Sequence, residues 1–251
     1  MKTVYLTIDD SPTEDFLDKV NYLYDRGIPA VFFCEGQKLL NHQAAVIEAI
    51  KKGFVIGNHS MNHDYFSDLT LDQGKASIRV TDQIIDRLYQ EAGHVRPGKY
   101  FRFPHFDQGG AKSGKAYEEK FSQPIETWTH HEDASKMQNL QTYLGALGYE
   151  QMPVEGLKMD YYHDKDLLNY VDVRCTFDQW EFQLGDPQAP YGLDKEEAIL
   201  NRLEEDEPYM GRALNRLDTS DIILIHDMVH TSHLFYKIID AYIDKGFTFK
   251  L

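Results

Sequence analysis

Short apolar runs alternate along this chain with longer stretches in which apolar positions recur every three or four residues. The β-branched and aromatic runs predict strands at 3–8, 29–34, 54–58, 100–103, 170–177, 221–225 and 247–250. The amphipathic stretches predict helices at 13–26, 37–52, 71–92, 136–147 and 232–245, with a helix-rich segment at 195–217. Strands that alternate with helices pair in parallel through right-handed crossovers, so we expect an α/β sheet or barrel. Six or more strands in 251 residues favour a barrel-like closure.

Neither an internal repeat nor a low-complexity linker interrupts the pattern, so residues 1–251 are interpreted as a single domain. Its least regular part is 106–169, which holds one predicted helix among many aromatic and polar residues.

Polar side chains follow the carboxyl ends of five predicted strands: Asp9-Asp10, His59, Arg102, Asp178 and His226. Parallel strands place these ends on one rim, which is where α/β barrels hold their chemistry. We therefore expect the five clusters to converge.

The most suggestive cluster is His59 and His63, four residues apart. Across one helical turn such residues share a face, and two imidazoles on one face can hold a divalent cation. The plain alternative is two surface histidines on a loop. Rival metal sites are the pair His226 and His230, and the run His130-His131-Glu132-Asp133. We rank both lower because neither follows a strand end with paired carboxylates.

Asp9-Asp10 can complete a metal site at His59 and His63, since catalytic zinc usually takes three protein ligands and leaves room for water. One aspartate would be the third ligand and the other a base. Both can reach the site if the chain turns at Ser11-Pro12. The alternative is that the pair caps a helix starting at Thr13.

Arg102 ends a predicted strand among aromatics, and a buried arginine needs a carboxylate partner. We expect that partner to be Asp178 or Glu181, and Arg102 to orient the base, although a purely structural ion pair is the alternative. His226 follows an apolar strand, and its alternative is a satisfied histidine at a capped strand end.

The formal net charge is −15, which argues against nucleic acid, anionic membranes and anionic polymers as main partners. No apolar run is long enough to span a bilayer, and Met1-Lys2-Thr3-Val4 leads directly into a strand without a secretory leader. We expect a cytoplasmic protein, although a trimmed secreted chain would look the same. Cys34 and Cys175 lie in apolar runs and are interpreted as buried free thiols, with a disulfide between them as the alternative that nothing in the sequence indicates.

Four motifs occur in order: Thr7-Ile8-Asp9-Asp10-Ser11-Pro12, His59-Ser60-Met61-Asn62-His63, Arg102-Phe103-Pro104-His105 and Leu224-Ile225-His226. Together they resemble the polysaccharide deacetylases, the NodB-homology family or carbohydrate esterase family 4, whose first two motifs are usually T-F-D-D-G-P and H-S-x-x-H. The resemblance implies a distorted (β/α) barrel. It also implies a divalent metal, usually zinc and sometimes cobalt or another ion, and an N-acetylated sugar or oligosaccharide as substrate.

Site roles also follow from the resemblance. Asp9 is implied as the catalytic base, Asp10, His59 and His63 as metal ligands, Arg102 as the residue that positions the base, and His226 as the acid. Asp178-Gln179-Trp180-Glu181-Phe182 resembles the family's D-x-x-D-W motif, which makes Asp178 a further catalytic candidate. We expect His105, Trp180 and Leu224 to contact substrate.

The chain departs from the family pattern at three places. Ser11 replaces the usual glycine, His105 stands where tyrosine or phenylalanine is common, and the D-x-x-D-W motif carries Glu181 and Phe182. The stretch 106–169, between the fourth strand and the Asp178 strand, is longer than expected. We interpret it as an insertion over the mouth of the site, where loops set specificity.

We therefore expect a metal-dependent hydrolase that removes an N-acetyl group from an amino sugar or oligosaccharide and releases acetate. Two alternatives remain: hydrolysis of another C–N bond, such as a formyl or cyclic amide, and a non-catalytic carbohydrate-binding module on the same fold. A module that only binds has no need of a base and an acid together. The sequence leaves the oligomeric state open.

Overall fold

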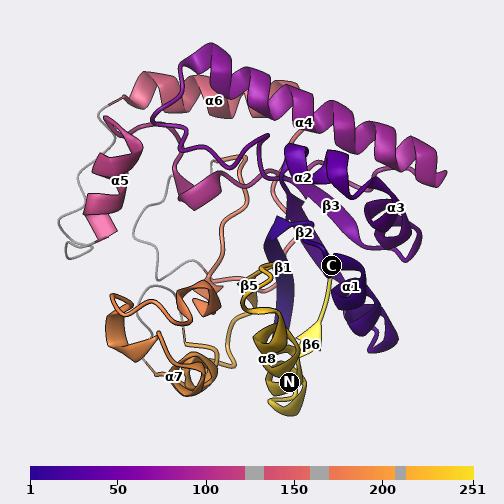
Figure 1. The fold of residues 1–251 in the computed structure, drawn as a ribbon, viewed down its shortest axis with the longest axis vertical. Coiled ribbons are helices and arrows are strands. Elements are labelled where there is room, and N and C mark those ends of the chain that lie inside the picture. The colour runs from indigo at the N-terminus through magenta and orange to yellow at the C-terminus, as the bar shows by residue number, and fades with distance from the viewer. Residues whose placement is uncertain (122–132, 159–169, 207–212) are drawn as a thin grey trace.

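The computed structural model describes residues 1–121, 133–158, 170–206 and 213–251. A parallel sheet forms its centre, in the order β3-β2-β1-β5-β4, with β6 paired to the start of β1 (Figure 1). The strands are β1 (Thr3–Ser11), β2 (Ala30–Cys34), β3 (Val55–Asn58), β4 (Phe177–Asp178), β5 (Asp221–His226) and β6 (Thr248–Phe249). The expected parallel α/β architecture is confirmed.

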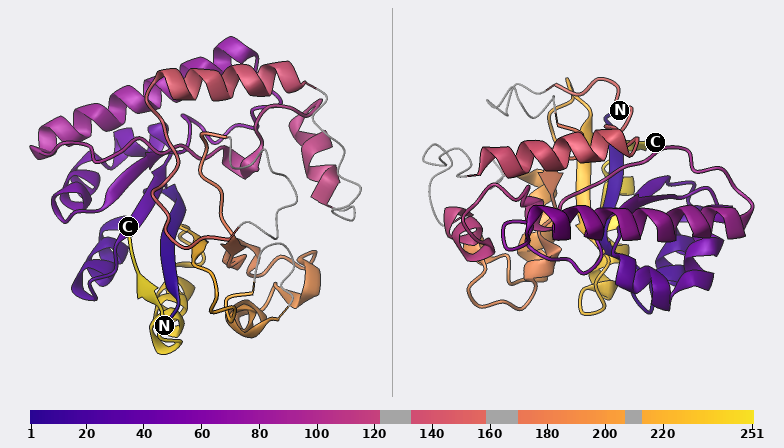
Figure 2. Two further views of the ribbon diagram at one scale, coloured as in Figure 1. Left: turned by 180° about the vertical axis from the view of Figure 1, so that it is seen from behind. Right: turned by 90° about the horizontal axis from the view of Figure 1, so that it is seen from above.

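Eight α-helices surround the sheet within the described residues: α1 (Phe16–Asp25), α2 (Gly36–Asn41), α3 (Gln43–Lys51), α4 (Leu71–Ala92), α5 (Gly114–Phe121), α6 (Ala134–Ala146), α7 (Glu196–Asn201) and α8 (Ser232–Asp244). Figure 2 shows α6 running alongside the long α4, and these two helices pack together. Because β1 has neighbours on both sides and helices over its faces, all its residues after Thr3 are buried.

The segment before β4 links the two outer parts of the sheet. Phe101 forms an isolated parallel bridge with Asn58, next to β3. The N–H of Val173 donates to Phe101 O (2.7 Å), and the N–H of Thr176 donates to Ile222 O in β5 (2.9 Å). Residues 173–178 thus hydrogen-bond to Phe101, beside β3, and to β5 on the other side of the sheet.

The helix expected at 71–92 is confirmed at both ends. Thr70 and Gln73 form a reciprocal capping box, and Gly93 ends the helix in the left-handed conformation (φ 75°). The helix expected at 37–52 is instead two helices, because His42 leaves helical geometry (φ −125°, ψ 30°). The bend lets both α2 and α3 pack against α4.

Two expected strands are much shorter than the apolar pattern indicates. The run 100–103 makes only the bridge at Phe101, because the next carbonyl, that of Arg102, accepts a side-chain hydrogen bond from His59. Of the run 170–177, only Phe177 belongs to a strand, the two-residue β4 that also includes Asp178. The helix α5 was not expected, because it has little apolar periodicity.

Candidate active site

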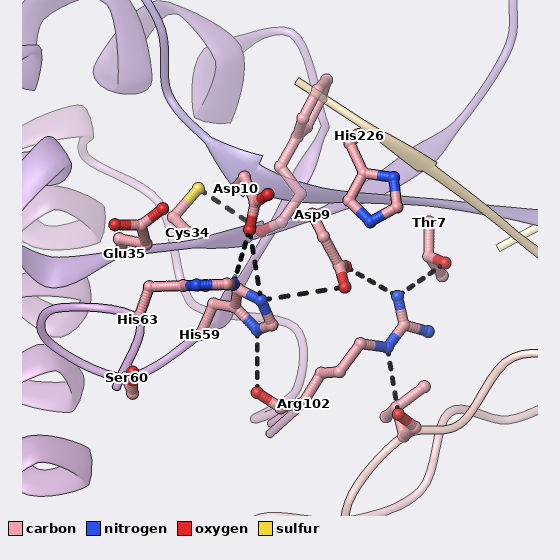
Figure 3. A network of polar contacts seen from close by, with 12 residues as sticks. Thr7, Asp9, Asp10, Cys34, Glu35, His59, Ser60, His63, Arg102 and His226 are labelled. Carbon is pink, nitrogen blue, oxygen red and sulfur yellow. Dashed lines mark hydrogen bonds and ion pairs between the residues drawn. The ribbon is translucent and has the colours of Figure 1, made fainter. Parts of the chain in front are cut away.

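Four of the predicted residues meet at the carboxyl ends of the strands (Figure 3). Asp9 and Asp10 lie near the end of β1, and Asp9 is in register with His226, the last residue of β5. His59 directly follows β3, and its N–H donates to Cys34 O at the end of β2 (2.9 Å). The convergence expected for parallel strands therefore holds here.

Asp10, His59 and His63 form one compact group of donor atoms. Asp10 Oδ1 lies 3.0 Å from Nε2 of His63 and 3.5 Å from Nε2 of His59. This oxygen is buried, and within the described residues the two imidazoles are the groups that it faces. Nδ1 of His59 contacts Arg102 O at 2.8 Å, so Nε2 is the nitrogen left to face Asp10. Two imidazoles and a carboxylate with all donor atoms within 4.8 Å of one another fit a divalent cation such as zinc.

The local backbone that builds this group differs from the one expected. His59 and His63 lie on a loop between β3 and α4, where Ser60 (φ 66°) and His63 (φ 60°) are left-handed, so the expected helical turn is wrong. Hydrogen bonds of the loop itself replace it: the N–H of Ser60 donates to Asn58 Oδ1 at 2.8 Å.

The expected turn at Ser11-Pro12 is also not what brings the two aspartates together. β1 continues through Ser11, but Asp10 has φ 62° and the pairing with β2 shifts register between Ile8 and Ser11. This irregularity turns Asp10 toward the histidines, while Asp9 keeps its place in the sheet.

Asp10 and His63 shift each other's pKa in opposite directions. Burial raises the pKa of Asp10, but the neighbouring imidazoles of His59 and His63 outweigh it and hold the pKa well below its usual range. Burial lowers the pKa of His63, but Asp10 reverses this and raises it. The carboxylate is thus held ionised, as a metal ligand must be.

Arg102 is fully buried and faces Asp9. Its Nη1 donates to Asp9 Oδ1 (2.7 Å) and to Thr7 Oγ1 (2.9 Å), while Nε donates to Val173 O (3.1 Å). The expectation that Asp178 or Glu181 would pair with Arg102 is wrong. The side chains of both lie instead with His226, so Asp9 is the carboxylate within reach of the guanidinium.

His226 is held by Glu181, which was expected as a possible partner of Arg102 and had no predicted contact with His226. Glu181 is 1% exposed, and its Oε1 accepts from the backbone N–H of His226 and lies 3.2 Å from His226 Nδ1. Burial lowers the pKa of His226, but the charges of Glu181 and Asp178 raise it to about 10. The signal that could have found Glu181 is its place in the D-x-x-D-W motif.

Asp178 lies beside this pair, with one oxygen within 4.8 Å of the donor atoms of Glu181 and His226. Burial raises the pKa of Asp178 to about 6, against the opposing effect of His226. Its Oδ1 accepts from the N–H of Trp180 at 3.0 Å. Asp178 therefore lies with Glu181 and His226, and not with the group formed by Asp10, His59 and His63.

Residues 1–115 match the model of the polysaccharide deacetylase family. The resemblance to the polysaccharide deacetylases is confirmed. The chain is 31% identical over 103 residues to a peptidoglycan-N-acetylglucosamine deacetylase of Bacillus cereus, covering 41% of this chain and 36% of that protein. It is 29% identical over 91 residues to the peptidoglycan-N-acetylmuramic acid deacetylase PdaC of Bacillus subtilis, covering 35% of this chain and 19% of that protein. The matches thus span about a third or less of the relatives' length.

Solved structures of deacetylase homologues share the fold over the whole chain. A family 4 carbohydrate esterase from Streptomyces lividans, in complex with acetate, superposes with a TM-score of 0.60 at 20% identity, covering 100% of this chain and 92% of that one. A family 4 pseudoenzyme from Bacillus anthracis gives 0.59 at 15% identity, covering 99% and 63%. The chain therefore shares its fold with a protein named as a carbohydrate esterase and with one named as a pseudoenzyme.

The three residues expected to contact substrate lie in three different environments. His105 has φ 55° and stacks on Tyr65, with ring centroids 3.8 Å apart and planes within 7°. Trp180 has φ 61° and lies against Phe182, whose ring meets His226 edge-on. Leu224 is 1% exposed inside β5. Their role in substrate binding stays a prediction.

The remaining expectations concern the rival metal sites, the thiols and membranes. His230 is exposed and joins no cluster of metal-binding groups among the described residues, while His130, His131 and Glu132 lie outside them. Cys34 is buried and Cys175 partly exposed, and neither forms a disulfide. In the described parts of the chain, no helix has the length and apolar character needed to cross a membrane.

Proposed function

We propose that this protein is a metal-dependent hydrolase that removes the N-acetyl group from an amino sugar or oligosaccharide and releases acetate. The observation that supports it best is the grouping of three sets of functional residues around one spot: Asp10 with two histidines, Asp9 with Arg102, and His226 with Glu181. Metal ligand, base and acid are the groups that amide hydrolysis needs. We further propose that residues 1–251 act as one catalytic domain, with 106–169 as an insertion over the site.

Asp10, His59 and His63 are the residues that would hold the metal, with zinc as the best fit to their donor set. When bound there, a divalent cation supplies a Lewis acid that activates water and polarises the amide carbonyl. Asp9, 3.8 Å from Nε2 of His59 through its Oδ2, is placed to take a proton from the attacking water. Arg102 fixes the other oxygen of Asp9 and so aims the free one at the site.

His226 is placed to protonate the leaving amine, which is a poor leaving group while unprotonated. Its raised pKa keeps a proton available at neutral pH, and Glu181 fixes its orientation through Nδ1. The backbone N–H of His105 donates to no acceptor within the described residues, so it is available to the oxyanion that forms on the amide carbonyl. Water cleaves the C–N bond, and the products are acetate and a free amine.

The B. cereus relative is named for peptidoglycan N-acetylglucosamine. For this chain we propose an N-acetylated glycan as the substrate class. The His59–His63 arrangement would serve a formyl amide or a cyclic amide equally. Assays on N-acetylated and N-formylated sugars distinguish the acyl groups.

The proposal is tested by metal analysis together with acetate and formate release from a panel of N-acylated sugars. We expect about one bound divalent ion per chain and release of acetate. Asp10→Ala and His59→Ala should lose the metal, whereas Asp9→Asn should keep it and lose about 10²- to 10⁴-fold in turnover. Acetate release by Asp9→Asn at the parental rate would refute the base assignment.

Two other outcomes would redirect the proposal. Loss of metal in His226→Ala, with metal retained in His59→Ala, would move the metal site to His226 and His230. Metal binding without release of any acyl group would place the chain with the non-catalytic members of its fold, such as the B. anthracis pseudoenzyme.

A further inference from the structure

The two histidines of the metal group are oriented by different means. Nδ1 of His59 lies 2.8 Å from Arg102 O, the kind of backbone partner that metal-binding histidines almost always have. Within the described residues, the imidazole of His63 makes no second hydrogen bond of this type. Something else must hold its ring with Nε2 toward Asp10.

Two rings contact that of His63: the ring of His59, with centroids 5.0 Å apart, and the ring of His105, which lies closer. The centroids of His63 and His105 are 4.4 Å apart with planes inclined at 67°, an edge-to-face contact. The ring of His105 also stacks on Tyr65 in a near-parallel arrangement. His105 thus contacts both an aromatic ring and the proposed ligand His63.

The backbone around His105 is fixed by a tight turn. The N–H groups of Phe106 and Asp107 donate to Phe103 O (3.0 Å) and Pro104 O (2.9 Å). Buried Asp107 then accepts from the N–H of Ser67 (2.7 Å), two residues beyond Tyr65. The two loops that carry the stacked rings are therefore tied to each other.

Tyr65 is supported in turn by the start of α5. Its hydroxyl donates to Glu118, and a Cβ on Gly114 would lie only 2.5 Å from Cγ of Tyr65. A glycine at the beginning of α5 thus permits the close approach. The contacts run without a break from α5 through Tyr65 and His105 to His63.

We propose that His105 is a positioning residue for the metal, holding the imidazole of His63 in its ligand orientation through the Tyr65–His105 stack. This inference rests on the proposed metal site at Asp10, His59 and His63. Ordering a mobile imidazole during binding costs conformational entropy and so lowers the affinity for the metal. An imidazole that is already held in its ligand orientation avoids that cost.

The test is the dissociation constant for Zn²⁺, measured by competition with a chelator on the full chain. We expect His105→Ala to weaken binding by about tenfold, the lower end of the range for outer-shell partners of metal ligands. His105→Phe retains a stacking ring and should stay within about threefold of the parent. His94→Ala, which removes an exposed histidine beyond the end of α4, should match the parent and controls for loss of an imidazole.

A second set of variants tests the Tyr65–His105 stack through Tyr65. Tyr65→Leu should also weaken Zn²⁺ binding, and the double variant with His105→Ala should lose no more than His105→Ala alone, because both act through one stack. The absorption spectrum of the Co²⁺-loaded protein should change in His105→Ala and be restored in His105→Phe. A general loss of packing would lower the thermal midpoint of the metal-free protein without this pattern.

The outcomes separate the inference from the proposed function. Parental Zn²⁺ affinity in both His105→Ala and Tyr65→Leu, with binding lost in His63→Ala, would refute the positioning role alone. Parental affinity in His63→Ala would refute the metal site itself.

Discussion

Arg102 and Asp9 are joined by a buried ion pair of 2.7 Å, although they lie on separate segments of the sheet. The same nitrogen of Arg102 reaches Thr7, and its Nε reaches the carbonyl of Val173. One guanidinium therefore connects β1 with the segment that precedes β4. Because Asp9 is the proposed base, this pairing links the packing of these two segments to the chemistry.

Arg102→Lys should keep a positive charge but lose the fork geometry that serves three acceptors at once. We expect turnover to fall by about tenfold to a hundredfold, the loss produced by a misplaced reacting group. Metal content should stay at the parental level, because the carbonyl of Arg102 still accepts from His59. Equal turnover in parent and variant would contradict a role in aiming Asp9.

Glu181→Gln should change the pH dependence of activity. An acid acts while protonated, so activity falls as pH rises through the pKa of His226. Glu181 and Asp178 raise that pKa to about 10, and removal of one negative charge lowers it. We expect the alkaline limb of kcat/KM against pH to move to lower pH by about one unit or more. An alkaline limb that stays in place would show that His226 is not the acid.

Removal of the proposed metal should destabilise the fold. Its three proposed ligands, Asp10, His59 and His63, come from β1 and from the loop after β3, so a bound metal would connect the two. A ligand at about one hundred times its dissociation constant stabilises a protein by about 2.7 kcal/mol. The thermal midpoint should rise on addition of Zn²⁺ and fall with a chelator. His59→Ala is the control, and it should show almost no response to either addition.

Lys19→Met should destabilise the protein independently of the metal. Lys19 and Asp227 are both fully buried, 2.6 Å apart, and this pair joins α1 to the residue that follows His226. Removal of the lysine leaves a buried carboxylate without its cation, which costs about 3 to 5 kcal/mol. Denaturant unfolding measures the loss. Lys51→Met, at an exposed pair with Glu48, should change little and is the matched comparison.

Local signals in the sequence predicted most of the regular elements and the rim of the site, but they missed α5 and the break between α2 and α3. The amphipathic pattern predicted the helix at 71–92 correctly, and its caps at Thr70 and Gly93 are local because capping depends on residues within one turn. The convergence of Asp9, Asp10, His59 and His226 was predicted from their positions after strands. The carboxyl ends of parallel strands lie on one rim whatever the order of the strands in the chain. The family motifs then assigned chemistry to those positions.

Tertiary structure alone decided which partners these residues have. Arg102 pairs with Asp9 instead of Asp178 or Glu181, and His63 is packed by His105, on a loop that no helical period describes. Left-handed backbone at Asp10, Ser60 and His105 sets where those side chains point. It is maintained by local hydrogen bonds and, at Ser60, also by the N–H of Gly36, which donates to Ser60 O (2.9 Å). Residue types and spacing along one chain carry strong information on short-range geometry. The direction of a side chain at a loop depends on contacts that form only when the whole sheet has assembled.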